Sequence, residues 1–417
     1  MTDSRRWLIL FVAWLGWVFD IMDAALFNFA KVPMLTDMLG EAGYKARGPA
    51  VEGLIQTIFI VGWALGGLIF GVLADRWGRS RTMVLTILLY CAFTGLTSLC
   101  QTWEQVAVVR FLTALGIGGE WAAGAALVAE SFPDTRRPLA AAFLQTAAAV
   151  GPILAATANL ALAHESWRWL FVVGLIPAVV TVFIRKAVGE SEPTREIKVK
   201  ASNPIRELFT NPKWRRNAII AMVIGTVGIA GAGNAAYWMP NLVKEASAGM
   251  AAEVVQARTS YITYAMHAGT LVGVFFFPWL AKVWGRKKAL LLGFIAAPSV
   301  TYFALQGSPS YESLFFIAPA ITLFAIGLSA IFGLYFPELF PTSIRATGSG
   351  FAYNVARIAQ APLPMITGVL IGAQTLALTM TAPRNVAHGV AMSALVYIIG
   401  LLALPFAPET KDKPLPE

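Results

Sequence analysis

Two acidic residues interrupt the first apolar segment of the sequence, where a charge is most costly. Asp20 and Asp23 lie within residues 7–35, about 20 Å along a helix that rises 1.5 Å per residue. An ionised carboxylate near the middle of a bilayer costs roughly 2.5–3.5 kcal/mol on insertion scales. A spacing of three places both acids on one helical face. We therefore expect them to face a watered cavity or partner charges, or to be protonated, and all three arrangements belong to a solute pathway.

The segments that must position these acids are apolar along the whole chain. The sequence has 417 residues, of which 57% are hydrophobic and 13% charged, against roughly 45–50% and 25% in soluble proteins. Apolar runs of about 20 residues, the length that crosses a bilayer, recur throughout. The sequence predicts an all-α, multi-pass membrane protein whose N-terminus leads into an uncleaved first span. Cys91 and Cys100 match no metal or redox spacing, so they are interpreted as small core residues.

Twelve transmembrane helices are predicted, in two groups of six. The first group is expected near residues 7–35, 52–74, 82–101, 104–130, 138–162 and 167–186, and the second near 214–240, 258–281, 287–306, 311–336, 343–371 and 386–407. The longest polar stretch lies between the groups. We therefore predict an N-terminal six-helix bundle at 1–187, a cytoplasmic linker at 188–213 and a C-terminal six-helix bundle with a short cytoplasmic tail at 214–417.

The distribution of basic residues predicts the orientation. With the N-terminus inside, the inner segments hold 23 Lys and Arg and the outer loops hold 6. Such an excess marks cytoplasmic loops. Both termini are expected in the cytoplasm, at the inner membrane. The net charge of +9 is explained by this topology, so no nucleic-acid partner is expected.

The two halves repeat each other. LADRWGR at 73–79 recurs as LAKVWGR at 280–286, and ESFPDTRR at 130–137 recurs as ELFPTSIR at 338–345. The offsets are 207 and 208 residues. A duplicated six-helix unit of the same orientation predicts two pseudo-symmetric bundles related by an axis along the membrane normal. This arrangement favours a transporter that rocks around a central cavity.

The loop after the second predicted span carries a family signature. GVLADRWGRSR resembles the G-x-L-x-D-R-x-G-R-K/R-x-R motif of the major facilitator superfamily. The resemblance covers nearly the whole chain. It implies a gating role for the residues of the motif, which are Gly71, Asp75, Arg76, Gly78 and Arg79. The alternative is a solvated, positively charged loop.

The repeat predicts further gating residues. Its second copy keeps Gly285 and Arg286 but replaces the acid by Lys282, so an asymmetric inner gate is expected. The turns after the fourth and tenth spans resemble the family's P-E-x-x-P-T-x-x-R elements. Their charged residues, expected to form salt bridges that break on opening, are Glu130, Arg137, Glu338 and Arg345. Ordinary loop turns are the alternative.

The fourth span holds two more intramembrane charges. RFLTALGIGGEWAAGAALVAESFP resembles the R-x-x-x-x-x-G-x-G-G-E-[WY]-x-x-G pattern of proton symporters for metabolites, aromatic acids and sialates. Arg110 is expected at the substrate and proton pathway, with a purely structural ion pair as the alternative. Glu120 is a candidate for proton coupling alongside Asp20 and Asp23.

The eleventh span supplies the first candidate for holding a carboxylate. Arg357 and Asn354 share a helical face in SGFAYNVARIAQAPLP, which resembles the same symporter families. A guanidinium offers a two-pronged donor to a carboxylate. Asn28 in the first span is also expected to contact substrate. Two residues stay open: Lys31 reaches the outer interface or attracts anions, and His267 titrates or is simply packed.

The sequence thus predicts a secondary transporter that imports an organic anion with protons by alternating access. The D-x-x-D of the first span resembles aromatic-acid symporters, whereas LGWVFDIMD and the length resemble the sialate and monocarboxylate group. Expected partners are a small organic acid, protons and membrane lipid, with no cofactor, no metal and a functional monomer. The alternatives are a proton-coupled exporter of drugs or metabolites and a transporter-like sensor. No enzyme motif is present, so an enzyme is not expected.

Overall fold

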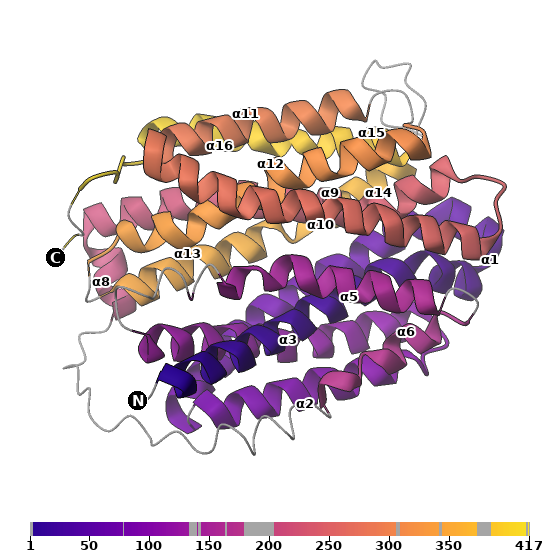
Figure 1. The fold of residues 1–417 in the computed structure, drawn as a ribbon, viewed down its shortest axis with the longest axis horizontal. Coiled ribbons are helices and arrows are strands. Elements are labelled where there is room, and N and C mark those ends of the chain that lie inside the picture. Colours follow the sequence, from indigo (N-terminus) through magenta and orange to yellow (C-terminus); the bar gives the residue numbers. More distant parts are fainter. Residues whose placement is uncertain are drawn as a thin grey trace. The chain divides into compact units, whose positions relative to one another are not determined.

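The computed structural model shows two compact units, drawn in Figure 1. It describes residues 3–77, 79–132, 140, 143–162, 165–178, 204–305, 309–341, 344–372, 385–413 and 416, with the side chains near 71–80, 119–131 and 345–346 outside the description. Unit 1 comprises residues 1–195 and 249–264, and unit 2 comprises 196–248 and 265–417. The predicted linker at 188–213 lies largely outside the described residues, so its boundaries stay a prediction. The described residues form helices and no strands.

The first helix of unit 1 is far longer than a single membrane crossing. Helix α1 runs Asp3–Trp77, with a non-helical backbone at Gly40 (φ 71°, ψ 161°). Its apolar part, Arg6–Phe70, has 65 residues. At 1.5 Å per residue that is about three times the thickness of the hydrocarbon layer. The first two predicted spans are therefore the two arms of α1, and the gap predicted at 36–51 is helical on both sides of the break at Gly40.

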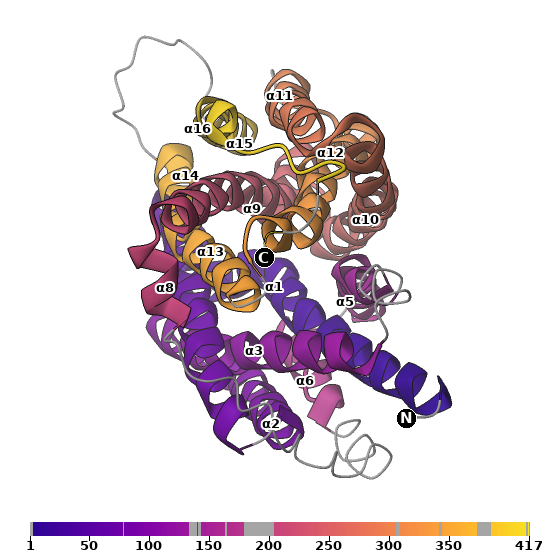
Figure 2. The same ribbon diagram turned by 90° about the vertical axis from the view of Figure 1, so that its left-hand side faces the viewer.

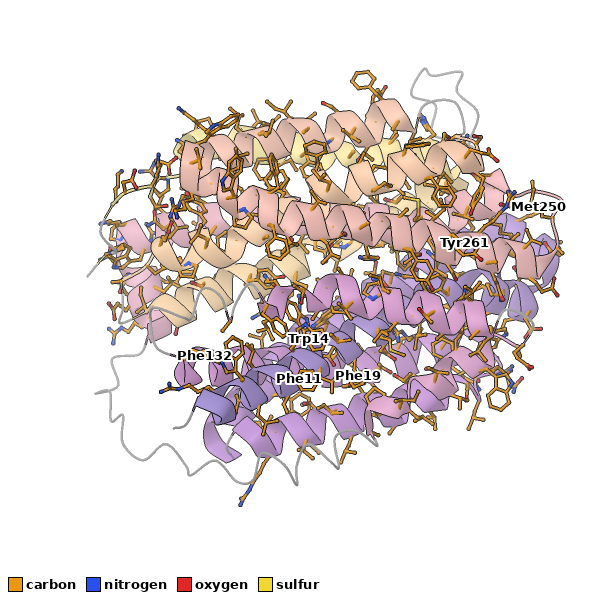
Figure 3. The ribbon with its side chains drawn as sticks, viewed as in Figure 1. Phe11, Trp14, Phe19, Phe132, Met250 and Tyr261 are labelled. Atoms are coloured by element: carbon orange, nitrogen blue, oxygen red, sulfur yellow. The ribbon has the colours of Figure 1, made fainter. Side chains whose placement is uncertain are left out.

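The other helices of unit 1 pack around these arms. They are α2 (Arg79–Thr97), α3 (Trp103–Ser131), α5 (Ala147–Ala161), α6 (Arg168–Val173) and the first part of α10 (Ala252–Trp284). Helix α3 begins with a capping box formed by Thr102 and Gln105. Seen end-on in Figure 2, α1, α2 and α3 lie side by side. Near the start of α1, Phe11 stacks on Trp14 at 5.8 Å between ring centroids (Figure 3).

Unit 2 contains α8 (Pro204–Thr210), α9 (Pro212–Ala246), the rest of α10, α11 (Arg286–Ala304) and α12 (Tyr311–Glu338). The chain continues through α13 (Arg345–Gln360), α14 (Pro362–Gly372), α15 (Val386–Ser393), η1 (Ala394–Val396), α16 (Tyr397–Ala403) and η2 (Leu404–Phe406). The eleventh predicted span is divided at Ala361. Pro362 begins the next helix, because proline has no N–H to continue the previous one. The short helix α8 was not predicted.

The internal repeat extends to helix packing in each unit. In unit 1, a Cβ on Gly62 or Gly66 would lie 2.7 or 2.1 Å from the backbone oxygen of Phe111 or Leu115. In unit 2, a Cβ on Gly269 or Gly273 would lie 2.1 or 2.4 Å from the backbone oxygen of Pro319 or Leu323. The glycines are 207 residues apart and their partners 208. Glycine permits backbone contact at these points, so both units bring the same two helices together in the same register.

Six segments of the described residues are long and apolar enough to cross a membrane. They are Arg6–Phe70, Phe143–Ala161, Pro212–Ala246, Ala252–Trp284, Tyr311–Glu338 and Val386–Phe406. The exposed side chains on several of them are large and apolar, including Phe275 at 57% and Phe316 at 80% exposure. Such surfaces suit lipid rather than water.

Candidate functional site

An ion pair is buried in unit 1 between α1 and α3. Arg110 Nη1 donates to Asp23 Oδ2 at 2.9 Å, and the side chains are 0% and 2% exposed. Thr94 of α2 donates its hydroxyl to the other carboxylate oxygen at 2.5 Å. Three helices therefore meet at the Asp23 carboxylate. The predicted partner charge for the first span is present, and it is Arg110.

Aromatic rings enclose the Arg110 guanidinium. Its central carbon lies 4.7 Å from the ring centroid of Phe27 and 4.2 Å from that of Phe59. Ring faces attract cations, most strongly where water is excluded. Both rings and both charges are buried. No local sequence pattern indicated Thr94, Phe27 or Phe59, because their contacts arise from packing between helices: Thr94 reaches Asp23, and the two rings reach Arg110.

The other predicted residues of unit 1 have different surroundings. Asp20 is fully buried on α1, one turn before Asp23. Asn28 is half-buried on the same helix. Glu120 lies on α3, and its side chain is outside the described residues. The sequence left open which of Asp20 and Asp23 carries the proton, with Asp23 preferred and Asp20 as a possible structural partner of an arginine. In the structure Arg110 pairs with Asp23, and Asp20 lies one turn earlier on the same helix.

A second buried ion pair joins the two arms of α1. Lys31 Nζ lies 3.2 Å from Glu52 Oε2, with both side chains 0% exposed. Tyr44 donates its hydroxyl to Glu52 Oε1 at 2.5 Å. Lys31 therefore reaches into the protein and pairs with an acid that the sequence analysis did not single out. Because these residues flank Gly40, the contact ties the arms together across the break.

In unit 2, the predicted carboxylate-holding residues lie on α13. The Arg357 guanidinium carbon is 5.2 Å from the ring centroid of Tyr353, and Arg357 is half-buried. Asn354 donates its amide to the carbonyl oxygen of Gly350 at 3.0 Å. The ring face attracts the guanidinium and restricts the arginine side chain.

His267 is buried on α10 in unit 2. It is 5% exposed, and its Nδ1 makes no hydrogen bond in the part of the chain that the structure describes. Thr322 of α12 donates to the carbonyl oxygen of the preceding Met266.

A charged cluster ties the start of α11 to the end of α12 and the tail. Arg286 donates to both oxygens of Glu338, from Nε at 3.0 Å and from Nη2 at 2.6 Å. Thr410 donates its hydroxyl to Glu338 Oε2 at 2.6 Å. Glu409 accepts from the backbone N–H groups of Arg286 and Lys287, each at 3.0 Å. The predicted gating residues Arg286 and Glu338 are thus brought together.

The carboxylate of Glu409 acts as a cap for α11 from 123 positions away in the chain. Burial opposes its ionisation, but backbone N–H donors of Lys411, Lys287, Arg286 and Thr410 favour it, and together they hold the pKa of Glu409 below its ordinary value of 4.5. A helix N-terminus favours an anion for the same reason. Gly285, predicted from the repeat, precedes this helix with φ 103°, a conformation that suits glycine.

The remaining predicted gating residues lie outside what the structure describes. The backbone of Gly71, Asp75, Arg76 and Arg79 is helical, as is that of Glu130 and Arg345, but their side chains are not described. Gly78 and Arg137 lie wholly outside the described residues. Their roles stay predictions.

Comparison with known proteins gives a consistent result. The Major Facilitator Superfamily profile matches residues 12–364. The chain is 32% identical over 366 residues to a probable 4-methylmuconolactone transporter of Cupriavidus pinatubonensis, covering 85% of this chain and 81% of that protein. It is 29% identical over 369 residues to the sialic acid transporter NanX of Escherichia coli, covering 87% of each.

Solved structures share the fold. The crystal structure of a D-xylose-proton symporter superposes with a TM-score of 0.74 at 18% identity, covering 98% of this chain and 99% of that chain. The predicted fold class is therefore confirmed. Because the family profile spans most of the chain, and the relatives align along more than four fifths of their length, the protein belongs to the Major Facilitator Superfamily.

Proposed function

We propose that the protein is a secondary transporter that imports an organic acid together with protons. The observation that carries this proposal is the buried ion pair of Asp23 and Arg110. Asp23 can bind a proton, and Arg110 can bind a substrate anion once Asp23 is neutral. Membership of the family and the transporter names of the relatives imply a transporter rather than an enzyme. Proton coupling and substrate class are the parts that need testing.

The proposed coupling follows from the donors around Asp23. An ionised carboxylate only accepts hydrogen bonds, and here it accepts from Arg110 and Thr94. A proton arriving on Asp23 neutralises it and weakens its hold on the Arg110 guanidinium. The freed guanidinium can then pair with the carboxylate of a substrate. When the substrate leaves, Asp23 loses the proton and pairs with Arg110 again.

We assign Arg357 to the second contact with the anion, with Asn354 and Asn28 as neutral donors. Asp20 and Glu120 are the candidates for a second proton. One proton moved with one monovalent anion is electroneutral, and a second proton would draw on the membrane potential, worth about 2.3 kcal/mol per charge per 100 mV. Sialic acid is a carboxylate at neutral pH, and a muconolactone carries a carboxymethyl group, so the relatives' named cargoes suit this chemistry.

The test uses purified protein in liposomes with an acid exterior. A thermal-shift screen of organic acids first identifies a ligand, and its uptake is then followed together with internal pH. Asp23→Asn is expected to abolish accumulation driven by the pH gradient while keeping exchange of labelled for unlabelled substrate. Asp37→Asn is the matched control on the same helix, because Asp37 is exposed and its only described side-chain contact is Trp167 Nε1 at 3.3 Å.

Two results would overturn the proposal. Full pH-driven accumulation by Asp23→Asn removes Asp23 from coupling. Proton movement opposite to the substrate would instead identify an antiporter. We also propose that both termini are cytoplasmic in the inner membrane, that the monomer is the functional form, and that the Arg286 and Glu338 pair is part of the inner gate.

A further inference from the structure

A pocket of about 400 Å³ opens on unit 2 at the beginning of α9. One wall is α9, and the other is the end of α16 with η2. Seen end-on in Figure 2, α15 and α16 lie next to α9. The lining residues are Pro212, Arg215, Arg216, Ile219, Ile220, Val223, Ala403 and Phe406.

The residues from α9 follow one helical face. Their spacing of three and four residues from Pro212 to Val223 is that of a single stripe. The stripe is about 16 Å long at 1.5 Å per residue. Arg215 and Arg216 lie near its first turn, and the positions after them are aliphatic. The pocket therefore has a cationic end and an apolar end.

At the cationic end, neither arginine forms an ion pair with a described acidic residue. The Arg215 side chain is exposed and forms no ion pair with the described residues. Arg216 donates from Nη2 to the carbonyl oxygen of Phe406 at 3.3 Å, which is a neutral partner. None of the residues lining the pocket is acidic. Among the described residues, the two guanidinium groups therefore lie together without a carboxylate to neutralise them.

The walls of the pocket also carry exposed apolar side chains. Ile219 is 49% exposed and Phe406 is 62% exposed. Both belong to segments long and apolar enough to cross the bilayer, Pro212–Ala246 and Val386–Phe406. The arginines lie at the beginning of the first segment and Phe406 at the end of the second, which is the depth of the headgroups. A free phosphate would match only the cationic end of this surface.

We propose that this pocket binds an anionic phospholipid, with the phosphate on Arg215 and Arg216 and an acyl chain along Ile219 and Val223. Guanidinium groups hold phosphate oxygens through paired N–H donors. Basic pockets between transmembrane helices are suited to anionic headgroups. None of the residues lining the pocket has a role in the proposed transport mechanism.

The test is native mass spectrometry of the purified, delipidated protein with phosphatidylglycerol, phosphatidylethanolamine or phosphatidylcholine. Phosphatidylglycerol is expected to bind most tightly. Arg215→Gln is expected to weaken its binding about fivefold, which is the contribution of one basic residue near an anionic surface. Lys213→Gln is the matched control. Lys213 lies in the same turn but contacts the Trp214 ring at 4.5 Å and does not line the pocket.

A second variant tests the acyl groove without changing charge. Val223→Trp is expected to fill the groove and weaken phosphatidylglycerol binding, while glycerol 3-phosphate, which has no acyl chain, is expected not to bind at all. The proposal is overturned if Arg215→Gln binds the lipid as wild type does, or if Lys213→Gln loses as much affinity. It is equally overturned if glycerol 3-phosphate binds as tightly as the lipid, or if Val223→Trp has no effect. Unchanged thermal melting of each variant confirms that it is folded.

Discussion

Asp23 of α1 and Arg110 of α3, which are 87 positions apart, neutralise each other at a point from which water is excluded. Taking a carboxylate and a guanidinium out of water is costly, and removing one partner leaves the other charge buried without compensation. Replacing one member of the pair is therefore expected to destabilise the folded protein more than replacing both.

This asymmetry predicts the behaviour of single and double variants. Arg110→Gln is expected to lower the free energy of unfolding by about 3–5 kcal/mol. Adding Asp23→Asn removes the uncompensated charge and is expected to recover much of that loss. Thermal melting in detergent measures both effects. Arg47→Gln, at an exposed arginine of α1, is the control and should change little. A double variant no more stable than Arg110→Gln would contradict the interpretation.

The contact across the break in α1 gives a second prediction. Tyr44→Phe removes the hydroxyl that donates to Glu52 and leaves the Lys31 pair intact. A hydrogen bond to a charged group contributes about 1.5–3 kcal/mol. The melting temperature should fall accordingly. Tyr261→Phe, at a 45% exposed tyrosine in the same unit, should leave it unchanged. Equal effects at the two sites would show that the Glu52 contact contributes nothing specific.

Glycine substitutions should have opposite effects at two positions. A Cβ on Gly118 would lie 2.0 Å from the backbone oxygen of Trp63, whereas a Cβ on Gly233 meets no atom within 4 Å. Gly118→Ala is expected to destabilise by about 1–3 kcal/mol or more through overpacking. Gly233→Ala is expected to stabilise by about 0.5–1 kcal/mol, because alanine is the better helix former. Melting curves of the two variants, compared side by side, decide the point.

The tail should detach at acid pH. The pKa of Glu409 in the folded protein lies below its ordinary value of 4.5, so its contribution to docking is complete above that pH and is lost as the pH falls through the folded pKa. A spin label on Asp412→Cys should become mobile below about pH 4.5 in electron paramagnetic resonance spectra. Both native cysteines are buried and can be replaced beforehand.

The control for this titration is Glu409→Gln. An amide carries no charge to hold the N–H groups of Arg286 and Lys287. The label should then be more mobile at neutral pH and should show no step as the pH falls below 4.5. A step of wild-type size in this variant would assign the transition to another group.

The sequence predicted the fold class well because apolar length is a strong signal in membrane proteins. It also limited the acids of the first span to three arrangements: facing a watered cavity, pairing with other charges, or being protonated. The choice between Asp20 and Asp23 could not be made, since a spacing of three puts both on one face, and which of them meets Arg110 depends on how α1 packs against α3. Helix α8 was missed because its seven residues make barely two turns, too few to show a helical period.

The sequence could not predict contacts between distant parts of the chain, because these contacts also depend on how the helices pack. Nothing near Glu409 in the sequence indicates that it caps α11, and nothing near Glu52 indicates Lys31 as its partner. The arms of α1 also differ from expectation. Residues 36–51 fall between the first two predicted spans, yet they are helical on both sides of Gly40.

The glycine contacts that recur in both units have a mechanical consequence. Where Gly273 meets Gly327, a Cβ on either would lie within 2.8 Å of the other's backbone. Helices in contact at that distance cannot slide past each other unless they first separate, because the neighbouring side chains would clash with backbone carbonyl groups. We therefore expect α10 and α12 of unit 2 to move as one rigid unit, as α1 and α3 do at Gly66 of unit 1. In any conformational change, the backbone would then bend outside these helix pairs.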